Sequence, residues 1–196
     1  LTYPIEFTEW VPNEVQTVYE DSKLTVETIP LDHKIDCSGY LFREKPKQKK
    51  IDRARIPQQL APAHIGKLKR GEDILNEEGT IRHKSSDVTL AAPPSYSYAF
   101  CSDTKYMPSL AEKLKGVDMI YHESSFLEEM AERATLTKHS TAKQAATVAR
   151  EAGAKQLLLG HFSSRYSALD EFLTEAREIF ENTQLANEGG VFKIGE

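Results

Sequence analysis

Three short apolar runs in the second half of the chain constrain the fold more than any other feature of the sequence. They are YAFCSD from Tyr98, DMIYHES from Asp118 and QLLLGHF from Gln156. Each run is long enough for one buried strand and too short for a helix. Segments with helical spacing lie between them, over about residues 108–115 and 140–151. Strands that alternate with helices indicate an α/β fold built in layers around a sheet.

Further elements are predicted on both sides of this region. The runs VQTVYED and LTVETIPL, at residues 15–21 and 24–31, are rich in β-branched residues, and the short segment between them predicts a tight turn. CSGYLFRE, at residues 37–44, predicts another strand. Ser140 or Thr141 can cap the helix that Gly153 ends. Apolar residues recur at helical spacing over residues 169–180, and GGVFKIG, at residues 189–195, predicts a last strand.

The composition is that of a soluble globular domain. Hydrophobic residues make up 39% of the 196 positions and charged residues 28%, and the apolar runs are far shorter than a bilayer span. No membrane association is therefore expected. The two cysteines, Cys37 and Cys101, are too few for a disulfide framework, and no signal segment opens the sequence, so we expect a cytoplasmic protein. Small core residues are the expected role of both thiols.

Charge is distributed unevenly along the chain. Residues 43–70 contain ten Lys or Arg and two acidic residues, a local charge of +8, whereas the whole chain carries −5, which leaves −13 for the rest. Such asymmetry is typical of a segment that meets a polyanion, although a solvated lysine-rich loop has the same composition. Because the apolar pattern also fails from about residue 44 to residue 94, apart from short helical pieces within 54–70, we interpret this stretch as an inserted flexible arm.

Three candidate metal ligands follow predicted strands. Asp103 and His161 come just after apolar runs, and His33 comes after LTVETIPL. In open α/β sheets, ligands bind beyond the carboxyl ends of the strands, and one carboxylate with two imidazoles suits zinc or manganese. A structural role for each histidine is the alternative. No serine lies in a G-x-S-x-G turn and no glycine-rich phosphate loop is present, which argues against a serine hydrolase and a nucleotide-binding loop.

Four motifs in order carry a resemblance to a known family. They are Ser-Asp-Thr at 102–104, His-Glu-Ser-Ser-Phe at 122–126, Lys-His-Ser-Thr at 138–141 and Gly-His-Phe-Ser-Ser-Arg-Tyr at 160–166. Together they closely resemble ribonuclease Z, the tRNA 3′-processing endonuclease of the metallo-β-lactamase superfamily. PLDHKIDCSGY, at residues 30–40, resembles the family segment that carries a ligand histidine. The resemblance implies that residues 1–196 form part of an αββα sandwich.

The resemblance also implies roles for individual residues. His33 would bind one zinc ion, His161 would bind the other, and Asp103 would bridge the two. The complete enzyme would hold two zinc ions per subunit, with manganese or magnesium as possible substitutes. His139 and Glu123 would handle protons beside the scissile phosphate, and His122 would be structural. The substrate would be precursor tRNA, cleaved to leave a 3′ hydroxyl by an enzyme that works as a homodimer.

The sequence departs from the family pattern in three places. The H-x-H-x-D-H signature that supplies most metal ligands is absent, so the chain resembles the carboxyl-terminal two thirds of the enzyme and is expected to be inactive alone. His-Glu-Ser-Ser replaces His-Glu-Ala-Thr, and the arm lacks the Gly-x-Pro element of the family's tRNA clamp. The residues expected to bind RNA in this arm are Lys45, Lys47, Lys49, Lys50, Arg53, Arg55, Lys67, Lys69 and Arg70.

Two other functions are compatible with these motifs. One is a different phosphodiesterase of the same superfamily that acts on small substrates, against which the basic arm argues. The other is a catalytically silent fragment that assists folding or binds RNA. Tight, stoichiometric zinc in the isolated chain would favour an enzyme.

Overall fold

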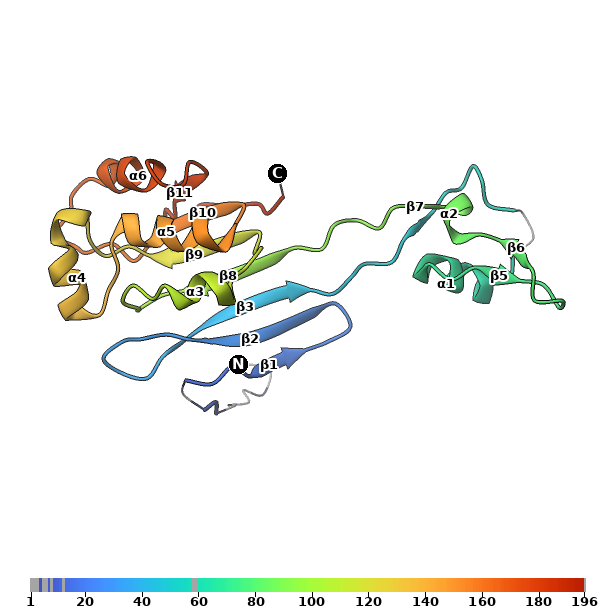
Figure 1. Cartoon of the computed structure of the whole chain (residues 1–196), viewed down its shortest axis with the longest axis horizontal. Helices are drawn as coiled ribbons and strands as arrows, with labels where there is room; N and C mark the ends of the chain where they lie inside the picture. Colours follow the sequence, from blue (N-terminus) through green and yellow to red (C-terminus); the bar gives the residue numbers. More distant parts are fainter. Residues whose placement is uncertain (1–3, 5–6, 8, 12, 58–59, 196) are drawn as a thin grey trace. The chain divides into compact units, whose positions relative to one another are not determined.

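The computed structural model describes residues 4, 7, 9–11, 13–57 and 60–195. The chain forms two compact units (Figure 1). Unit 1 consists of residues 1–44 and 96–196, and unit 2 consists of residues 45–95. No helix among the described residues combines the length and the apolar character that crossing a bilayer requires.

A seven-stranded sheet forms the centre of unit 1 (Figure 1). The first three strands are antiparallel to their neighbours, and β8 to β11 are parallel to one another. In spatial order the strands are β1 (Thr17–Glu20), β2 (Leu24–Pro30), β3 (Ser38–Glu44), β8 (Ser97–Cys101), β9 (Met119–Glu123), β10 (Gln156–Gly160) and β11 (Thr183–Leu185). The parallel strands β8, β9 and β10 are the ones that the three apolar runs predicted.

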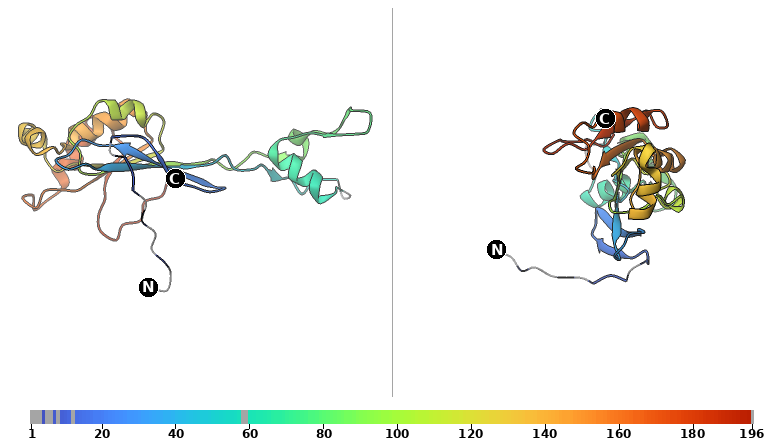
Figure 2. Two further views of the ribbon diagram at one scale, coloured as in Figure 1. Left: turned by 90° about the horizontal axis from the view of Figure 1, so that it is seen from below. Right: turned by 90° about the vertical axis from the view of Figure 1, so that its left-hand side faces the viewer.

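Helices cover one face of this sheet (Figure 2). They are α3 (Ser109–Lys113), α5 (Ala142–Ala152) and α6 (Asp170–Arg177), and α5 packs between the other two. The small side chains of α5, Ala145, Ala149 and Ala152 among them, are buried and let the helix approach the sheet closely. Thr141 caps α5 in a capping box with Gln144. The predicted cap is therefore confirmed.

The last predicted strand is wrong. Residues 189–195 contain no strand, and β11 lies earlier, at Thr183–Leu185, paired in parallel with β10. Gly189 has φ +73°, a left-handed conformation that turns the chain where a strand would have to extend. The Arg177 guanidinium donates two hydrogen bonds to the Thr183 carbonyl, at 3.0 and 3.1 Å, which fixes the start of β11 directly after α6.

The sheet face opposite the helices carries half-buried aromatic side chains. Phe42 lies 5.8 Å from Tyr98, and Phe100 stacks on Tyr121 at 4.7 Å between ring centroids. These residues alternate along their strands with Leu41, Ala99 and other members of the core beneath the helices, so their side chains point to the other face. Partly exposed aromatic area of this kind is typical of a surface that binds another protein surface.

We therefore expect the chain to self-associate through this aromatic face. Phe42→Lys places a charge on the face and should shift the species in sedimentation velocity at micromolar concentration towards monomer. Leu136→Lys is the matched control, because Leu136 is 81% exposed on α4 (Ala131–Thr137), outside the sheet. A monodisperse wild-type monomer would contradict the expectation.

Asp118 joins the starts of three parallel strands. Its carboxylate accepts hydrogen bonds from the backbone N–H of Ser97, at 2.7 Å, and from the Ser97 hydroxyl, at 2.8 Å, and it pairs with Lys155 Nζ at 2.7 Å. Burial alone would raise the pKa of Asp118, but these hydrogen bonds outweigh it, so its pKa lies below the ordinary value.

Asp118→Asn should lower the free energy of unfolding at neutral pH by about 1–3 kcal/mol, because it weakens charged hydrogen bonds in a buried place. A carboxyl whose pKa is lowered by folding contributes stability above its unfolded pKa and loses that stability as the pH falls. The difference between wild type and variant should therefore shrink below about pH 4. Urea unfolding at several pH values measures this difference in the free energy of unfolding. Asp36→Asn, at an exposed aspartate, is the control and should change the free energy by less than about 0.5 kcal/mol.

Unit 2 is a small folded module within the stretch interpreted as an arm. Leu68, Ile74 and Val88 form its buried core, and the buried Ser85 hydroxyl donates to the Leu68 carbonyl at 2.8 Å. Its elements are β4 (Lys50–Ile51), α1 (Pro62–Arg70), β5 (Ile74–Leu75), β6 (Ile81–His83), α2 (Ser85–Val88) and β7 (Thr89–Leu90). Helix α1 agrees with the helical pieces expected within residues 54–70. The role of the module as an arm stays a prediction.

Candidate active site

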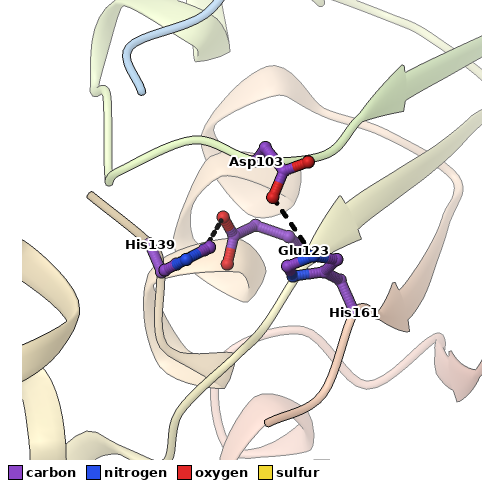
Figure 3. A group of neighbouring side chains, drawn as sticks. All are labelled: Asp103, Glu123, His139 and His161. Carbon is purple, nitrogen blue, oxygen red and sulfur yellow. Dashed lines mark hydrogen bonds and ion pairs between the residues drawn. The ribbon is translucent and has the colours of Figure 1, made fainter. Parts of the chain in front are cut away.

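Four polar side chains meet where three parallel strands end. Asp103 follows β8, Glu123 is the last residue of β9, and His161 directly follows β10. His139 comes from the connection between α4 and α5. Ligand atoms of all four lie within 4.8 Å of one another, and their side chains converge in Figure 3. The register aligns Gly160 with Glu123, so the strand ends reach the same edge.

Three residues around this group have left-handed backbones. Asp103, Lys138 and His161 each have φ +58°, which is uncommon for residues with a Cβ and costs energy unless neighbours hold it. A side chain contacts the carbonyl of each one: Cys37 Sγ donates to Asp103 at 3.3 Å, His33 Nδ1 donates to Lys138 at 2.9 Å, and Ser125 Oγ lies 2.9 Å from the carbonyl of His161. These bonds stabilise turns that aim the functional side chains at one point.

Glu123 is fully buried and surrounded by donors. Its Oε1 accepts from the Thr104 N–H at 2.7 Å and from His139 Nδ1 at 2.8 Å. Its Oε2 accepts from the Ser125 hydroxyl at 2.9 Å and from the Ser140 N–H at 3.1 Å. A buried carboxylate is tolerated when its lone pairs are satisfied in this way. The side chain is thus fixed in position and acts as an acceptor toward His139.

The His139 and His161 rings stack beside each other. Their centroids are 5.3 Å apart and their planes differ by 26°. His139 donates from Nδ1 to Glu123, which leaves its Nε2 as the nitrogen able to exchange a proton with a ligand. This arrangement of a buried carboxylate behind an imidazole is typical of general acid–base catalysis.

Asp103 and His161 form the more exposed half of the group. His161 Nε2 lies 3.1 Å from Asp103 Oδ1, with 40% and 45% of the two side chains exposed. An imidazole nitrogen and a carboxylate oxygen at this separation suit a shared cation, and both are ligands that zinc and manganese accept. The donor set therefore fits the metal ligands that the sequence predicted at these two positions.

His33 lies beside the group and is not one of its four members. Its ring centroid is 4.9 Å from that of His139, and its Nδ1 donates to the Lys138 carbonyl, which leaves Nε2 for a ligand. Lys138 Nζ in turn donates to Asp32 at 2.8 Å and to the His33 carbonyl at 2.9 Å. Lys105 and Lys138 together hold the pKa of Asp32 below its usual value. The structure thus places His33 next to the group, and its role as a ligand stays a prediction.

His122 is buried in β9. Because successive side chains of a strand point to opposite faces, His122 points away from the four-residue group that the next residue, Glu123, joins. Its Nδ1 donates to the Glu123 carbonyl at 2.7 Å, and burial lowers the pKa of His122. In the described part of the chain its Nε2 has no hydrogen-bond partner. These contacts are those of a neutral histidine inside the sheet.

Several residues that hold the site were not among the sequence-predicted ones. Thr104, Ser125 and Ser140 all donate to Glu123. Gly160 has no side chain, and a Cβ at this position would clash with the Tyr121 ring. Each of them lies inside one of the four quoted motifs. Their position in the motifs was therefore the available signal, but their hydrogen-bond partners depend on tertiary contacts.

The nine basic residues predicted to bind RNA lie in unit 2 and differ in their surroundings. Lys49 donates to Ser85 at 3.4 Å, Arg55 pairs with Asp52 at 3.4 Å and Arg70 pairs with Glu72 at 2.6 Å. Lys50, Arg53 and Lys67 are exposed. Lys47, Arg55 and Arg70 are exposed as well, and RNA binding by the nine residues stays a prediction.

Known proteins that are similar to this chain in sequence include ribonucleases Z. The chain is 43% identical over 196 residues to the ribonuclease Z of Cytophaga hutchinsonii, a match that covers 100% of this chain and 63% of that protein. It is 41% identical over 189 residues to the ribonuclease Z of Bacteroides fragilis, which covers 96% and 62%. By sequence, the whole chain is a homologue of ribonuclease Z. It spans under two thirds of the length of these curated relatives. No family model matches the sequence.

Solved structures show the fold of this ribonuclease Z homologue. The metallo-β-lactamase fold protein YhfI from Bacillus subtilis superposes with a TM-score of 0.58 at 18% identity, over 94% of this chain and 54% of that one. The short form of human tRNase Z gives a TM-score of 0.54 at 19% identity, over 93% and 48%. The chain therefore has the metallo-β-lactamase fold, as the sequence predicted.

Proposed function

We propose that this chain is the part of a metal-dependent ribonuclease Z that carries the proton-handling pair and part of the metal site. The enzyme would remove the 3′ trailer from precursor tRNA in the cytoplasm, as a homodimer with zinc as its metal. The contact of His139 Nδ1 with the buried Glu123, beside Asp103 and His161, supports this proposal most directly. The homology to ribonuclease Z supports precursor tRNA as the substrate.

The residues divide the chemistry between them. Asp103 and His161 would hold the metal, and His33 is close enough to be a further candidate. When bound, the metal activates water and stabilises negative charge on the phosphate. His139, oriented by Glu123, would take up a proton from solvent at Nε2, becoming an imidazolium, and transfer that proton to the leaving 3′ oxygen. Glu123 keeps the ring in the required tautomer because its Oε1 accepts from Nδ1.

The basic module is the observation that favours RNA over a small phosphodiester as substrate. Residues 45–95 carry eleven Lys or Arg and six acidic residues, a charge of +5, which leaves −10 for the rest of the chain. Phosphate backbones attract such a module without regard to base sequence. A small-molecule phosphodiesterase would have no use for it.

The proposal is tested with a full-length chimera. This chain is joined to the part of the C. hutchinsonii ribonuclease Z that has no counterpart in it, and the product is called the chimera below. With zinc, the chimera should release the 3′ trailer from a precursor tRNA and leave a 3′ hydroxyl, and a chelator should stop it. A folded, zinc-loaded chimera that hydrolyses only small phosphodiesters would favour the other phosphodiesterase activity instead.

A further inference from the structure

The Ser125 hydroxyl lies at the centre of the site and has more neighbours than it has protons. Its Oγ is 2.9 Å from Glu123 Oε2, 2.9 Å from the His161 carbonyl, 3.0 Å from His161 Nδ1 and 3.3 Å from His139 Nδ1. The serine is buried, with 4% of its surface exposed. Water therefore has little access to Ser125 Oγ, so its hydrogen bonds must be made with the four neighbouring protein atoms.

The proton inventory decides which nitrogen of His161 carries a hydrogen. A carboxylate oxygen and a carbonyl oxygen can only accept, so the single Ser125 proton goes to Glu123 or to the His161 carbonyl. No proton is then left for a bare His161 Nδ1, and two lone pairs would face each other at 3.0 Å. The contact is favourable only if Nδ1 carries the hydrogen and donates it to Ser125 Oγ.

The opposite side of the ring does not impose such a condition. His161 Nε2 faces Asp103, and the two side chains are 40% and 45% exposed, so water can satisfy both. The buried contact at Nδ1 therefore dominates over the exposed one at Nε2. The lone pair of Nε2 is thereby directed at the place where a metal would be shared with Asp103.

We propose that Ser125 is a positioning residue that fixes the tautomer of His161, with Nδ1 protonated and Nε2 free for a metal, and links this ring to the Glu123–His139 pair. The inference extends the proposed metal site but does not depend on tRNA cleavage. Partners of this kind behind a ligand histidine are typically worth about 10- to 100-fold in metal affinity.

The direct test is the tautomer of each ring in the 196-residue chain. Histidine labelled with ¹⁵N reports, through long-range ¹H–¹⁵N correlations, which nitrogen carries the hydrogen. The spectra are recorded without metal at about pH 8.5, where an ordinary imidazole is neutral. In wild type, His161 should be protonated at Nδ1. A wild-type His161 protonated only at Nε2 would overturn the proposal, whatever any variant does.

Three variants separate positioning from general structure. Ser125→Ala should move the His161 hydrogen to Nε2, where the Asp103 carboxylate accepts it at 3.1 Å, whereas Ser125→Thr keeps the hydroxyl and should keep the wild-type tautomer. Ser124→Ala is the matched control, because the Ser124 hydroxyl is buried but donates to the Gly160 carbonyl, at 3.3 Å, and contacts no imidazole of the residues that the structure describes. His139, held by Glu123, should stay protonated at Nδ1 in all of them and serves as an internal reference.

Zinc affinity, measured by calorimetry on the same chains, gives a second readout. Ser125→Ala should bind zinc about 10- to 100-fold more weakly than wild type, with Ser125→Thr and Ser124→Ala close to wild type. Unchanged tautomer and unchanged affinity in a folded Ser125→Ala chain would refute the positioning role. Loss of tRNA cleavage by the chimera with the tautomers as expected would instead count against the proposed function alone.

Discussion

His139→Ala in the chimera is expected to lower the rate of precursor-tRNA cleavage about 10²- to 10⁴-fold, the usual contribution of a general acid or base. The ring is the one group of the site whose Nδ1 is held by a buried carboxylate while Nε2 is left for a ligand. Glu123→Gln should have an effect in the same direction, because an amide cannot hold the ring in the same tautomer with equal strength. Single-turnover rates with saturating enzyme measure both.

Metal content distinguishes this role from metal binding. His139→Ala should retain the zinc of the parent chimera, as determined by atomic emission, whereas His161→Ala should lose zinc together with activity because its Nε2 faces Asp103. Equal retention of zinc in both variants, or equal loss, would show that the division of roles between the two rings is wrong.

The fold could be predicted from the sequence where local signals and tertiary packing agree. The apolar runs that became β8, β9 and β10 are buried on the face that the helices cover and are largely apolar on the other face as well, so their composition identifies them as strands. The run at residues 189–195 has the same appearance but lies where two glycines turn the chain, and the shorter β11 is defined by its pairing with β10. The sequence of a three-residue strand is too short to predict which strand it pairs with.

The sequence could predict which residues belong to the site, but not which atoms of those residues contact one another. Strand ends and motifs identify Asp103, Glu123, His139 and His161, which the structure brings within 4.8 Å. They could not reveal that Ser125 contacts two of the histidines, because its neighbours are 14 and 36 residues away in sequence. The left-handed backbones at Asp103 and His161 are equally invisible, since they are held by Cys37 and Ser125 across the fold.

Substitution of basic residues in unit 2 is expected to weaken precursor-tRNA binding by the chimera without changing its chemistry. Lys50, Arg53 and Lys67 are the residues to replace with alanine, because they are exposed, whereas Lys49 takes part in a hydrogen bond to Ser85 inside the module. If each contacts a phosphate, each loss should reduce the slope of log K against log salt by about 0.7, or about 2 for the triple variant. Filter binding over a range of salt concentrations measures the slope.

The control separates specific contacts from net charge. Lys113→Ala and Lys115→Ala remove exposed lysines from unit 1, and beyond the Debye length of about 8–10 Å their charges are screened from RNA bound elsewhere. They should leave the slope unchanged. Because phosphate contacts carry no base information, the triple variant should weaken all precursor tRNAs alike and leave hydrolysis of a nitrophenyl phosphodiester intact. An unchanged slope with unchanged affinity would mean that these three residues belong to a solvated surface, and that RNA is held by other parts of the enzyme.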